Sequence, residues 1–294
     1  MITRTEALEE LISAAATTSD IWRPEQLPGR VALLDQLDGL VGFPVLADLP
    51  CGSDARVISL ARTLQAQLES ANEELYEFAR AEIASGCDSS ILRQWLVGSA
   101  TCEEAGSPSP GLRFDQRDDI LSGVLQFIEP DNAELPWSLD MAPYQPTPVR
   151  HILDLIAASN LAHDDILIDL GSGLGHVPLL VSILTRSRTL GVERQPSYVA
   201  TAQECALRLN MQRVQFIAAD ARLADLSTGT VFYLYTPFTG LILTDVLDRI
   251  RMQSISRPIR ICSLGPCTRV LADQPWLRST APPNAGRIAA FTSR

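Results

Sequence analysis

The sequence contains no lysine, only three histidines and only six cysteines. Because all 24 basic residues are arginines, no lysine is present to act as a general base or to form a Schiff base. The cysteines form no CxxC pair and the histidines do not fall at zinc-ligand spacings, so we expect no metal site. Reduced, mostly buried thiols are typical of a cytoplasmic protein, which is the location that we expect.

Long hydrophobic runs are also missing from the sequence. No stretch of about 18 uninterrupted apolar residues occurs, so we expect no membrane span. The first 20 residues carry four acids and no long apolar run, which argues against a signal peptide. The 294 residues, of which 46% are hydrophobic and 20% charged, are typical of a globular protein with one large or two modest domains.

Charge is unevenly distributed along the chain, which has a net charge of −11. Residues 1–149 hold 9 arginines and 24 acids, a net charge of −15, whereas residues 150–294 hold 15 arginines and 11 acids, a net charge of +4. An acidic half repels a phosphate backbone, and no arginine-rich stripe or tail supplies the counterion release that nucleic-acid binding needs. The charge pattern therefore argues against nucleic acid as a partner, although the C-terminal half alone does not exclude it.

The N-terminal part is predicted to be helical. Residues 1–128 form an acidic α-helical domain in this interpretation, with helices expected at 5–17, 53–85, 90–99 and 119–128. The apolar stripe expected along the long helix consists of Leu60, Leu64, Leu68, Leu75 and Phe78. Residues 129–148 contain five prolines and are predicted to be an extended connector or lid between two domains.

The C-terminal part, residues 149–294, alternates strands with helices. This alternation predicts an α/β fold with a doubly wound, mostly parallel sheet. The expected helices are 148–160, 176–186, 197–210 and 239–252, and the expected strands are 166–170, 189–193, 214–218, 231–235, 258–263 and 287–292.

A glycine-rich turn follows the first of these strands. Glycines at 171, 173 and 175 permit positive φ angles and close approach of a ligand, and the helix that follows offers free N–H groups at its N-terminus. A dinucleotide-binding turn of the form G-x-G-x-x-G would need glycine at position 176, which is His176. Asp169 beside the turn favours a ligand with a cationic amino-acid group rather than a pyrophosphate, which indicates S-adenosylmethionine.

Four elements in order carry a resemblance to a known family. They are D-L-G-S-G-L-G at 169–175, G-V-E at 191–193, A-D-A at 219–221 and V-F-Y-L-Y-T-P-F at 231–238. Together they resemble the class I (Rossmann-like) S-adenosylmethionine-dependent methyltransferases over roughly residues 144–294. The sequences of the first two elements are most similar to those of the branch of non-SET histone-lysine methyltransferases. The basic tail of that branch is not visible here, so work on histones is not implied.

The resemblance implies a set of cofactor-binding residues. Asp169 and the turn would hold the methionine moiety, Glu193 the ribose hydroxyls, and Asp220 with Ala221 the adenine. The whole predicted set is Asp169, Gly171, Ser172, Gly173, Gly175, Glu193, Asp220, Ala221 and Thr147. Alternatives remain open: Asp169 as a cap for the loop amides, Asp225 in place of Asp220, and Ser172 as a residue that merely suits the turn.

The catalytic residues are not identified by sequence. Tyr144 lies in a segment that resembles the one covering the methionine end of the cofactor, and Thr236 lies where amino-group methyltransferases carry an acceptor motif. Both residues are weak candidates. Thr236 in particular is a poorer match to the acceptor motif than the usual Asn or Asp. His176 is either a general base or a partly exposed residue at a helix start. The family usually closes its sheet with an antiparallel hairpin, which 268–273 and 286–294 would form here.

The resulting prediction is a methyltransferase that uses S-adenosylmethionine and methylates a small-molecule or protein acceptor, on nitrogen or oxygen. The alternative from another class is a sensor or scaffold protein that binds S-adenosylmethionine without catalysis. A nicotinamide-dependent oxidoreductase is disfavoured by His176 and Asp169. The sequence indicates neither the acceptor nor the oligomeric state.

Overall fold

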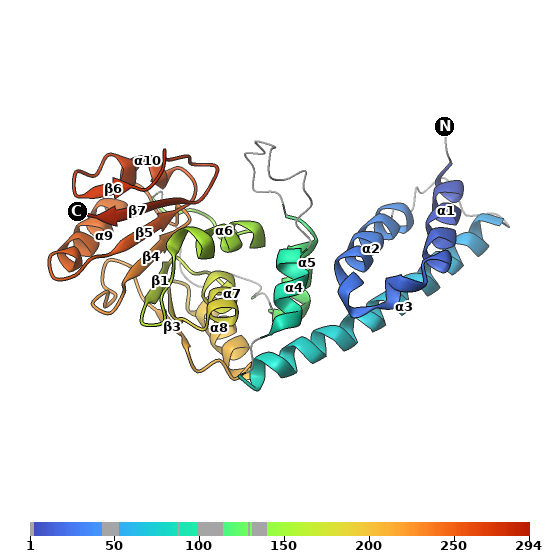
Figure 1. The fold of residues 1–294 in the computed structure, drawn as a ribbon. Coiled ribbons are helices and arrows are strands. Elements are labelled where there is room, and N and C mark those ends of the chain that lie inside the picture. Colours follow the sequence, from blue (N-terminus) through green and yellow to red (C-terminus); the bar gives the residue numbers. More distant parts are fainter. Residues whose placement is uncertain (1–2, 43–52, 87–88, 99–113, 129, 131–139) are drawn as a thin grey trace. The chain divides into compact units, whose positions relative to one another are not determined.

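The computed structural model describes residues 3–42, 53–86, 89–98, 114–128, 130 and 140–294 (Figure 1). The chain divides into two compact units. One comprises Met1–Ala81, Ser90–Thr101 and Asp115–Val124, and the other comprises Leu125–Arg294 together with Glu82–Ser89 and Cys102–Phe114. Residues 129 and 131–139 of the predicted connector lie outside the described residues. Residues 140–148 belong to the C-terminal unit.

The described N-terminal elements are all helical. A capping box begins the first helix, because the Thr3 side chain accepts from the Glu6 amide and the Glu6 carboxylate accepts from the Thr3 amide. Helix α2 and two short 3₁₀ turns were not assigned from the sequence. The elements are α1 (Arg4–Thr17), η1 (Ser19–Trp22), η2 (Pro24–Gln26), α2 (Leu27–Val41), α3 (Ser53–Ala84), α4 (Ser90–Gly98) and α5 (Gln116–Leu125).

The predicted apolar stripe on α3 is partly wrong. Leu60 and Phe78 are 49% and 52% exposed. The prediction followed the largest apolar side chains, but the packed face combines small and polar residues with large ones. The buried positions, which keep helical spacing, are Val57, Ala61, Gln65, Leu68, Asn72, Tyr76, Ala79 and Ile83.

A buried arginine explains Asn72, one of the polar positions on this face of α3, whereas Gln65 donates to Asp38 Oδ1 at 2.5 Å. Arg30, on α2, is fully buried and donates hydrogen bonds to Asn72 Oδ1 and to the carbonyls of Ile21 and Arg23. A buried guanidinium is tolerated only when such acceptors surround it. The contact therefore ties η1 and α2 to the middle of α3.

The C-terminal unit alternates strands and helices, close to the predicted ranges. Its elements are α6 (Val149–Ser159), β1 (Ile166–Leu170), α7 (His176–Thr185), β2 (Arg188–Glu193), α8 (Pro196–Arg208), β3 (Val214–Ala218), β4 (Val231–Leu234), α9 (Gly240–Ser254), β5 (Arg260–Ser263), α10 (Cys267–Ala272), β6 (Leu277–Ser279) and β7 (Ala289–Ser293).

These strands form one seven-stranded sheet in the order β3-β2-β1-β4-β5-β7-β6. β1 to β5 pair in parallel, whereas β7 runs antiparallel to both β5 and β6 (Figure 1). The predicted fold class, an α/β fold with a doubly wound, mostly parallel seven-stranded sheet preceded by helices, is confirmed.

The predicted closing hairpin is half wrong. Residues 268–272 lie in helix α10, and the strand β6, which follows that helix, pairs with β7. Cys267, Thr268 and Leu271 are buried, while Val270 is exposed, which is the spacing of a helix rather than a strand. This spacing shows only once burial is known, because the sequence of so short an apolar run is compatible with either a helix or a strand.

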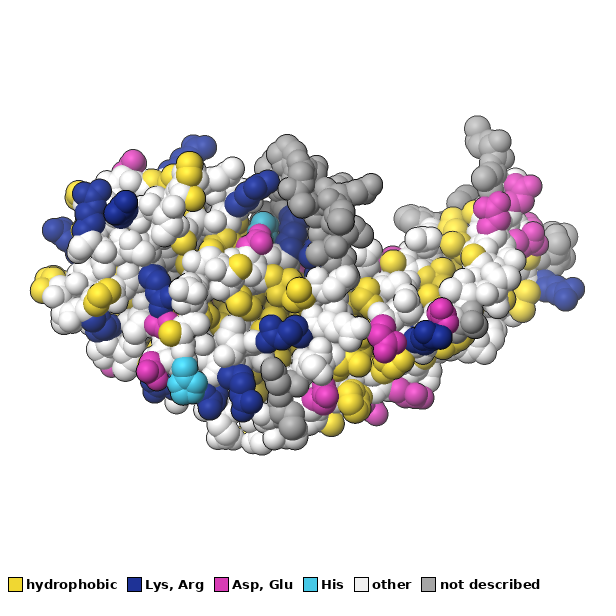
Figure 2. Space-filling model, in the orientation of Figure 1, with side chains coloured by type: hydrophobic (Ala, Val, Ile, Leu, Met, Phe, Trp, Pro, Cys, Tyr) yellow, Lys and Arg dark blue, Asp and Glu magenta, His cyan; other side chains and the backbone are white. Residues whose placement is uncertain are grey.

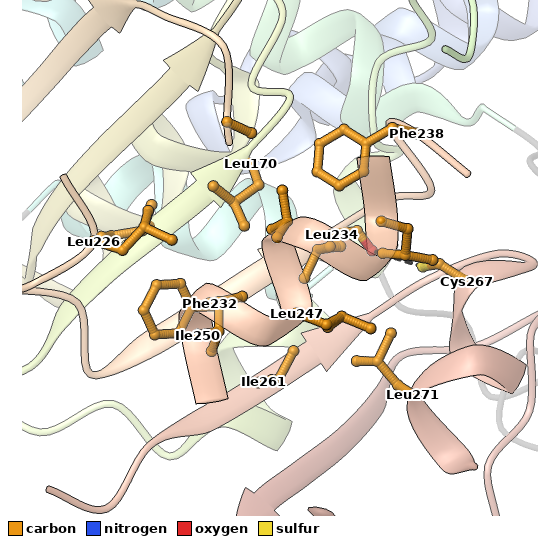
Figure 3. Close-up of a cluster of buried hydrophobic side chains, with 14 of the residues drawn as sticks. Leu170, Leu226, Phe232, Leu234, Phe238, Leu247, Ile250, Ile261, Cys267 and Leu271 are labelled. Carbon is orange, nitrogen blue, oxygen red and sulfur yellow. Dashed lines mark hydrogen bonds between the residues drawn. The ribbon is translucent and has the colours of Figure 1, made fainter. Parts of the chain in front are cut away.

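The main core lies between one face of the sheet and helices α9 and α10 (Figure 3). Phe232 and Leu234 of β4 point to this face because their positions alternate along the strand. They pack with Leu247 and Ile250 of α9 and with Leu271 of α10. Tyr233, between them in the sequence, points to the opposite face, on which α6 packs.

The charge difference between the two parts is visible at the surface. Figure 2 shows arginine side chains scattered over the C-terminal unit and acidic side chains over the N-terminal helices. The described cysteines, Cys205, Cys262 and Cys267, are free and buried, and the other three lie outside the described residues. None of the helices in the described ranges is both long and apolar enough to cross a membrane.

Candidate functional site

A cavity of about 580 Å³ lies at the carboxyl ends of the parallel strands. The strand order reverses between β1 and β4, and in open α/β sheets such a switch point opens a crevice outside the strand ends. The volume is in the range of small-molecule sites. All lining residues belong to the C-terminal unit, and they include residues 141–147, which we call the strap.

Most of the predicted site residues line this cavity. From the predicted set these are Asp169, Gly171, Ser172, Glu193, Asp220, Ala221, Thr147, Tyr144 and Thr236. Gly173 and Gly175 are not among the lining residues. Strands β1, β2 and β3 each end at the same edge of the sheet, which brings together acids that are 24 and 27 residues apart in the sequence.

The three glycines of the turn have positive φ angles, of 86°, 51° and 88°. A Cβ at Gly173 would lie closer than 3.0 Å to the ring of Tyr144. The space that a side chain would need there is thus filled by the strap rather than left open for a ligand. Glycine at 173 is required both by the left-handed backbone and by this close packing.

Asp169, at the end of β1, is 3% exposed and lines the cavity. Burial raises the pKa of its carboxyl well above the usual value, and the neighbouring Glu193 raises it further. Within the described ranges, no donor contacts this carboxylate. Ser172 Oγ, also in the cavity wall, is buried without a hydrogen-bond partner among the described residues. Both groups therefore suit a polar ligand.

Glu193, at the end of β2, is bound to the backbone around it. Its Oε2 accepts from the Gly173 amide at 2.9 Å, and its Oε1 accepts from the amides of Arg194 at 2.7 Å and Gln195 at 2.9 Å. A carboxylate offers about four acceptor positions. These contacts leave about one position for a ligand, and they fix the turn relative to β2.

Asp220, just after β3, is paired with Arg222. Oδ1 accepts from the amide and Nε of Arg222, and Oδ2 accepts from its Nη2 at 2.7 Å. Hydrogen bonding by the Arg222 side chain lowers the pKa of the Asp220 carboxyl. Asp225, the alternative candidate, accepts from the Ser227 amide and is not among the lining residues.

An aromatic cluster stands at the start of α7. The Tyr144 hydroxyl lies 3.4 Å from His176 Nδ1, and the rings of Tyr144 and Tyr198 are 5.1 Å apart. The Phe127 ring meets the His176 ring edge-on at 4.7 Å. Burial lowers the pKa of His176 from 6.5 to about 4, so its ring is neutral at neutral pH. A group with this pKa is a weak general base.

Thr147 and Thr236 are both engaged with the protein. Thr147 Oγ1 lies 3.3 Å from the Tyr233 hydroxyl, which places the start of α6 over β4. Thr236 Oγ1 donates to the Leu264 carbonyl at 2.9 Å and accepts from the Cys267 amide at 3.1 Å. The Thr236 hydroxyl thus holds the loop between β5 and α10, which leaves it little capacity to bind an acceptor.

Two lining residues that carry unpartnered polar atoms were not singled out from the sequence. Tyr235 Oη and His151 Nδ1 are buried and have no hydrogen-bond partner among the described residues. The alternation of β4 already places Tyr235 on the same face as Tyr233, but nothing in the sequence places α6 beside it. Within the described ranges, no group of three His, Cys, Asp or Glu side chains could hold a metal ion.

Comparison with known proteins finds similarity in structure only. No family profile and no curated protein matches the sequence. An RNA methyltransferase from Salinibacter ruber, solved with S-adenosyl-L-homocysteine, has 21% identity and a TM-score of 0.39, and the match covers 51% of this chain and 92% of that one. A precorrin-6Y C5,15-methyltransferase from Geobacter metallireducens has 16% identity, a TM-score of 0.39 and coverage of 52% and 92%.

A tRNA (uracil-54, C5)-methyltransferase from Pyrococcus abyssi, also solved with S-adenosyl-L-homocysteine, has 15% identity and a TM-score of 0.38. That match covers 51% of this chain and 39% of the other. TM-scores below 0.5 support no inference about ligand or activity, so the function has to be argued from the site itself.

Proposed function

We propose that the C-terminal unit binds S-adenosylmethionine in this cavity and transfers its methyl group to an acceptor. The observation that supports this best is the buried Asp169 carboxylate, which has no partner in the described part of the chain and lines the cavity. A buried, unpaired carboxylate is costly, and a cationic ligand offsets that cost. S-adenosylmethionine carries both an ammonium and a sulfonium group.

The other lining residues fit the remaining parts of this ligand. Ser172 Oγ is an unused donor for its carboxylate. Glu193 has about one acceptor position for a ribose hydroxyl, and Asp220 has about one for the adenine amino group. Ala221 is buried beside the cavity and presents a small apolar surface to an adenine ring.

When bound, the cofactor supplies a methyl group that is already activated on a sulfonium sulfur. The protein then has to hold the acceptor atom in line, and positioning of this kind lowers a barrier by several kcal/mol without a general base. The neutral His176 and the engaged Thr236 hydroxyl are consistent with such a mechanism. Tyr144, whose ring covers Gly173, helps to position rather than to transfer protons.

The acceptor class in this proposal is a small molecule or a protein. The negative N-terminal half argues against nucleic acid as the acceptor, and this too stays a prediction. The resemblance to the non-SET histone-lysine branch and the cytoplasmic location also stay predictions.

Calorimetric titration of the full chain tests cofactor binding. We expect micromolar binding of S-adenosylmethionine and of its demethylated product S-adenosylhomocysteine, and no binding of NAD. If neither adenosyl ligand binds, the proposal is wrong. Binding of NAD instead would favour the oxidoreductase alternative.

Glu193→Ala then tests the assignment of the ribose site. The variant removes a charge-assisted acceptor and the support of Gly173, so affinity should fall by about 2–3 kcal/mol. Glu204→Ala is the matched control, because Glu204 is exposed on α8 and does not line the cavity. Unchanged affinity in Glu193→Ala would contradict the assignment.

Methyl transfer separates an enzyme from a sensor. The protein is incubated with cell extract and a cofactor labelled in the methyl group. Label that moves to extract components only when the protein is present supports the methyltransferase, whereas cofactor binding without transfer supports the alternative of a sensor or scaffold.

A further inference from the structure

The two ends of the cavity differ sharply in charge. Every carboxylate and guanidinium among the described lining residues belongs to a residue at the end of β1 or β2 or just after β2 or β3, and these are Asp169, Glu193, Arg194 and Asp220. We call this end the β1–β3 half. The other end, which we call the β4–β5 half, is formed by residues 235–238 after β4, 264–266 after β5, and 285–286 before β7. It contains no charged side chain.

Backbone hydrogen bonds fix the strap against the β4–β5 half. The Ala142 amide donates to the Pro237 carbonyl at 3.1 Å, and the Thr239 amide donates to the Asp140 carbonyl at 2.8 Å. Met141 forms an isolated antiparallel bridge with Phe238. The strap is thereby joined to the end of β4, and the guanidinium of Arg194, which donates to Met141 Sδ at 3.4 Å, lies against the strap.

The uncharged β4–β5 half selects against a charged ligand. A cation that enters this half leaves its water shell and finds no carboxylate among the described residues that form it, so its transfer is unfavourable by several kcal/mol. An anion meets only the Arg194 guanidinium at the strap, which already contacts Met141 Sδ. An uncharged group gains instead from contact with Tyr235, Phe238 and Leu264, which line this end.

Two lining residues of the cavity each carry a buried polar atom that has no partner in the described part of the chain. One is the hydroxyl of Tyr235, which directly follows β4, and Thr147, two residues before α6, lies 3.3 Å from the hydroxyl of Tyr233 in β4. His151 lies in the first turn of α6 and is 5% exposed. Its Nδ1 is 3.7 Å from the exposed carboxylate of Asp154, which is beyond hydrogen-bond distance.

We propose that the β4–β5 half binds an uncharged small-molecule acceptor whose polar atom accepts a hydrogen bond from Tyr235 Oη and contacts His151 Nδ1. Tyr235 is then a specificity-determining residue. Since the Tyr235 hydroxyl keeps its proton at neutral pH, with a pKa that burial raises to about 12, it acts as a donor. The inference rests on the proposed function, because it treats the β1–β3 half as the cofactor end.

Three probes of equal size but different charge test the inference. Acetophenone is neutral and offers a carbonyl oxygen, benzoate is an anion, and benzylammonium is a cation. Binding of each to the full chain saturated with S-adenosylhomocysteine is measured by saturation-transfer NMR and titration. We expect acetophenone to bind in the millimolar range and both ions to bind at least about tenfold more weakly.

Equal or tighter binding of either ion would overturn the inference, as would the absence of acetophenone binding. Failure of S-adenosylhomocysteine to bind in the first step would instead overturn the proposed function. One experiment on the unmodified protein thus distinguishes failure of this inference from failure of the proposed function.

Tyr235→Phe tests the hydrogen bond. Loss of one neutral hydrogen bond should weaken acetophenone binding by roughly threefold to tenfold, while the affinity for S-adenosylhomocysteine stays within about twofold. Tyr76→Phe is the control, since Tyr76 is a buried tyrosine of α3 outside the cavity lining, and it should change neither affinity. A loss of cofactor affinity in Tyr235→Phe would place the hydroxyl in the cofactor site and contradict the proposal.

Discussion

The β1–β3 half and the β4–β5 half of the cavity are built in different ways. In the first, charged groups stand at strand ends and are fixed by backbone amides, as Glu193 is by three of them. In the second, uncharged side chains meet from the strap, α6 and the loops after β4 and β5. The first half therefore offers charged groups to a ligand, whereas the residues that form the second half offer only uncharged side chains.

The largest expected effect comes from the glycine turn that supports the charged half. Gly173→Ala forces a Cβ into the Tyr144 ring at a positive φ of 51°. Backbone strain and overpacking together should lower the free energy of unfolding by about 2–4 kcal/mol and abolish cofactor binding. Urea denaturation and calorimetry measure the two effects.

Gly86→Ala is the matched control for this variant. Gly86 also has a positive φ, of 75°, but a Cβ there would meet nothing within 4 Å. It should therefore lose only about 1–2 kcal/mol of stability from the backbone and keep cofactor binding. Equal losses in the two variants would show that the packing of Tyr144 on Gly173 is unimportant.

A second prediction concerns the charge of Asp169. Because burial raises its pKa, the folded state holds this proton more tightly than the unfolded chain, so stability falls as the pH rises above the ordinary value of 3.8. Asp169→Asn removes this loss and should raise the melting temperature of the ligand-free protein at neutral pH, with no gain below that value. The same variant should weaken cofactor binding by about 2–3 kcal/mol.

Thermal unfolding across pH and calorimetry check both parts. A lower melting temperature at neutral pH together with unchanged cofactor affinity would contradict the role given to Asp169. Such a result would instead favour the simpler interpretation of Asp169 as a cap for the loop amides.

The smallest effect is expected at His176. Its pKa is about 4 in the folded state and 6.5 ordinarily, so the unfolded chain takes up the proton first as the pH falls. The free energy of unfolding should therefore decrease as the pH falls from 6.5 to about 4, by about 1–3 kcal/mol in total. His176→Gln should show a smaller decrease in melting temperature over this range, and an identical decrease would exclude His176 as its source.

The same comparison explains what the sequence could predict. The acids of the β1–β3 half follow strands that pair in parallel, so their spacing along the chain is enough to bring Asp169, Glu193 and Asp220 to one edge. Tyr235 and His151 line the same cavity only because α6 packs on the sheet beside β5 and β7. That contact depends on tertiary packing, which no local pattern encodes.

The errors have related physical causes. The predicted stripe on α3 includes Leu60 and Phe78 because large apolar residues dominate such patterns. The packed face instead includes Asn72, which accepts a hydrogen bond from the buried Arg30 of α2, and this contact depends on tertiary packing. The glycine turn was predicted correctly as a turn with positive φ, whereas the filling of its open side by Tyr144 could not be predicted. The partner residue comes from the strap, 29 positions earlier.

A crystal structure of the full chain with S-adenosylhomocysteine bound tests the central claim most directly. Our account predicts that the amino group of the ligand contacts Asp169, that its adenosine lies between Glu193 and Asp220, and that the space beside Tyr235 stays open. A ligand whose adenosine occupies the β4–β5 half, or whose amino group points away from Asp169, would contradict the account.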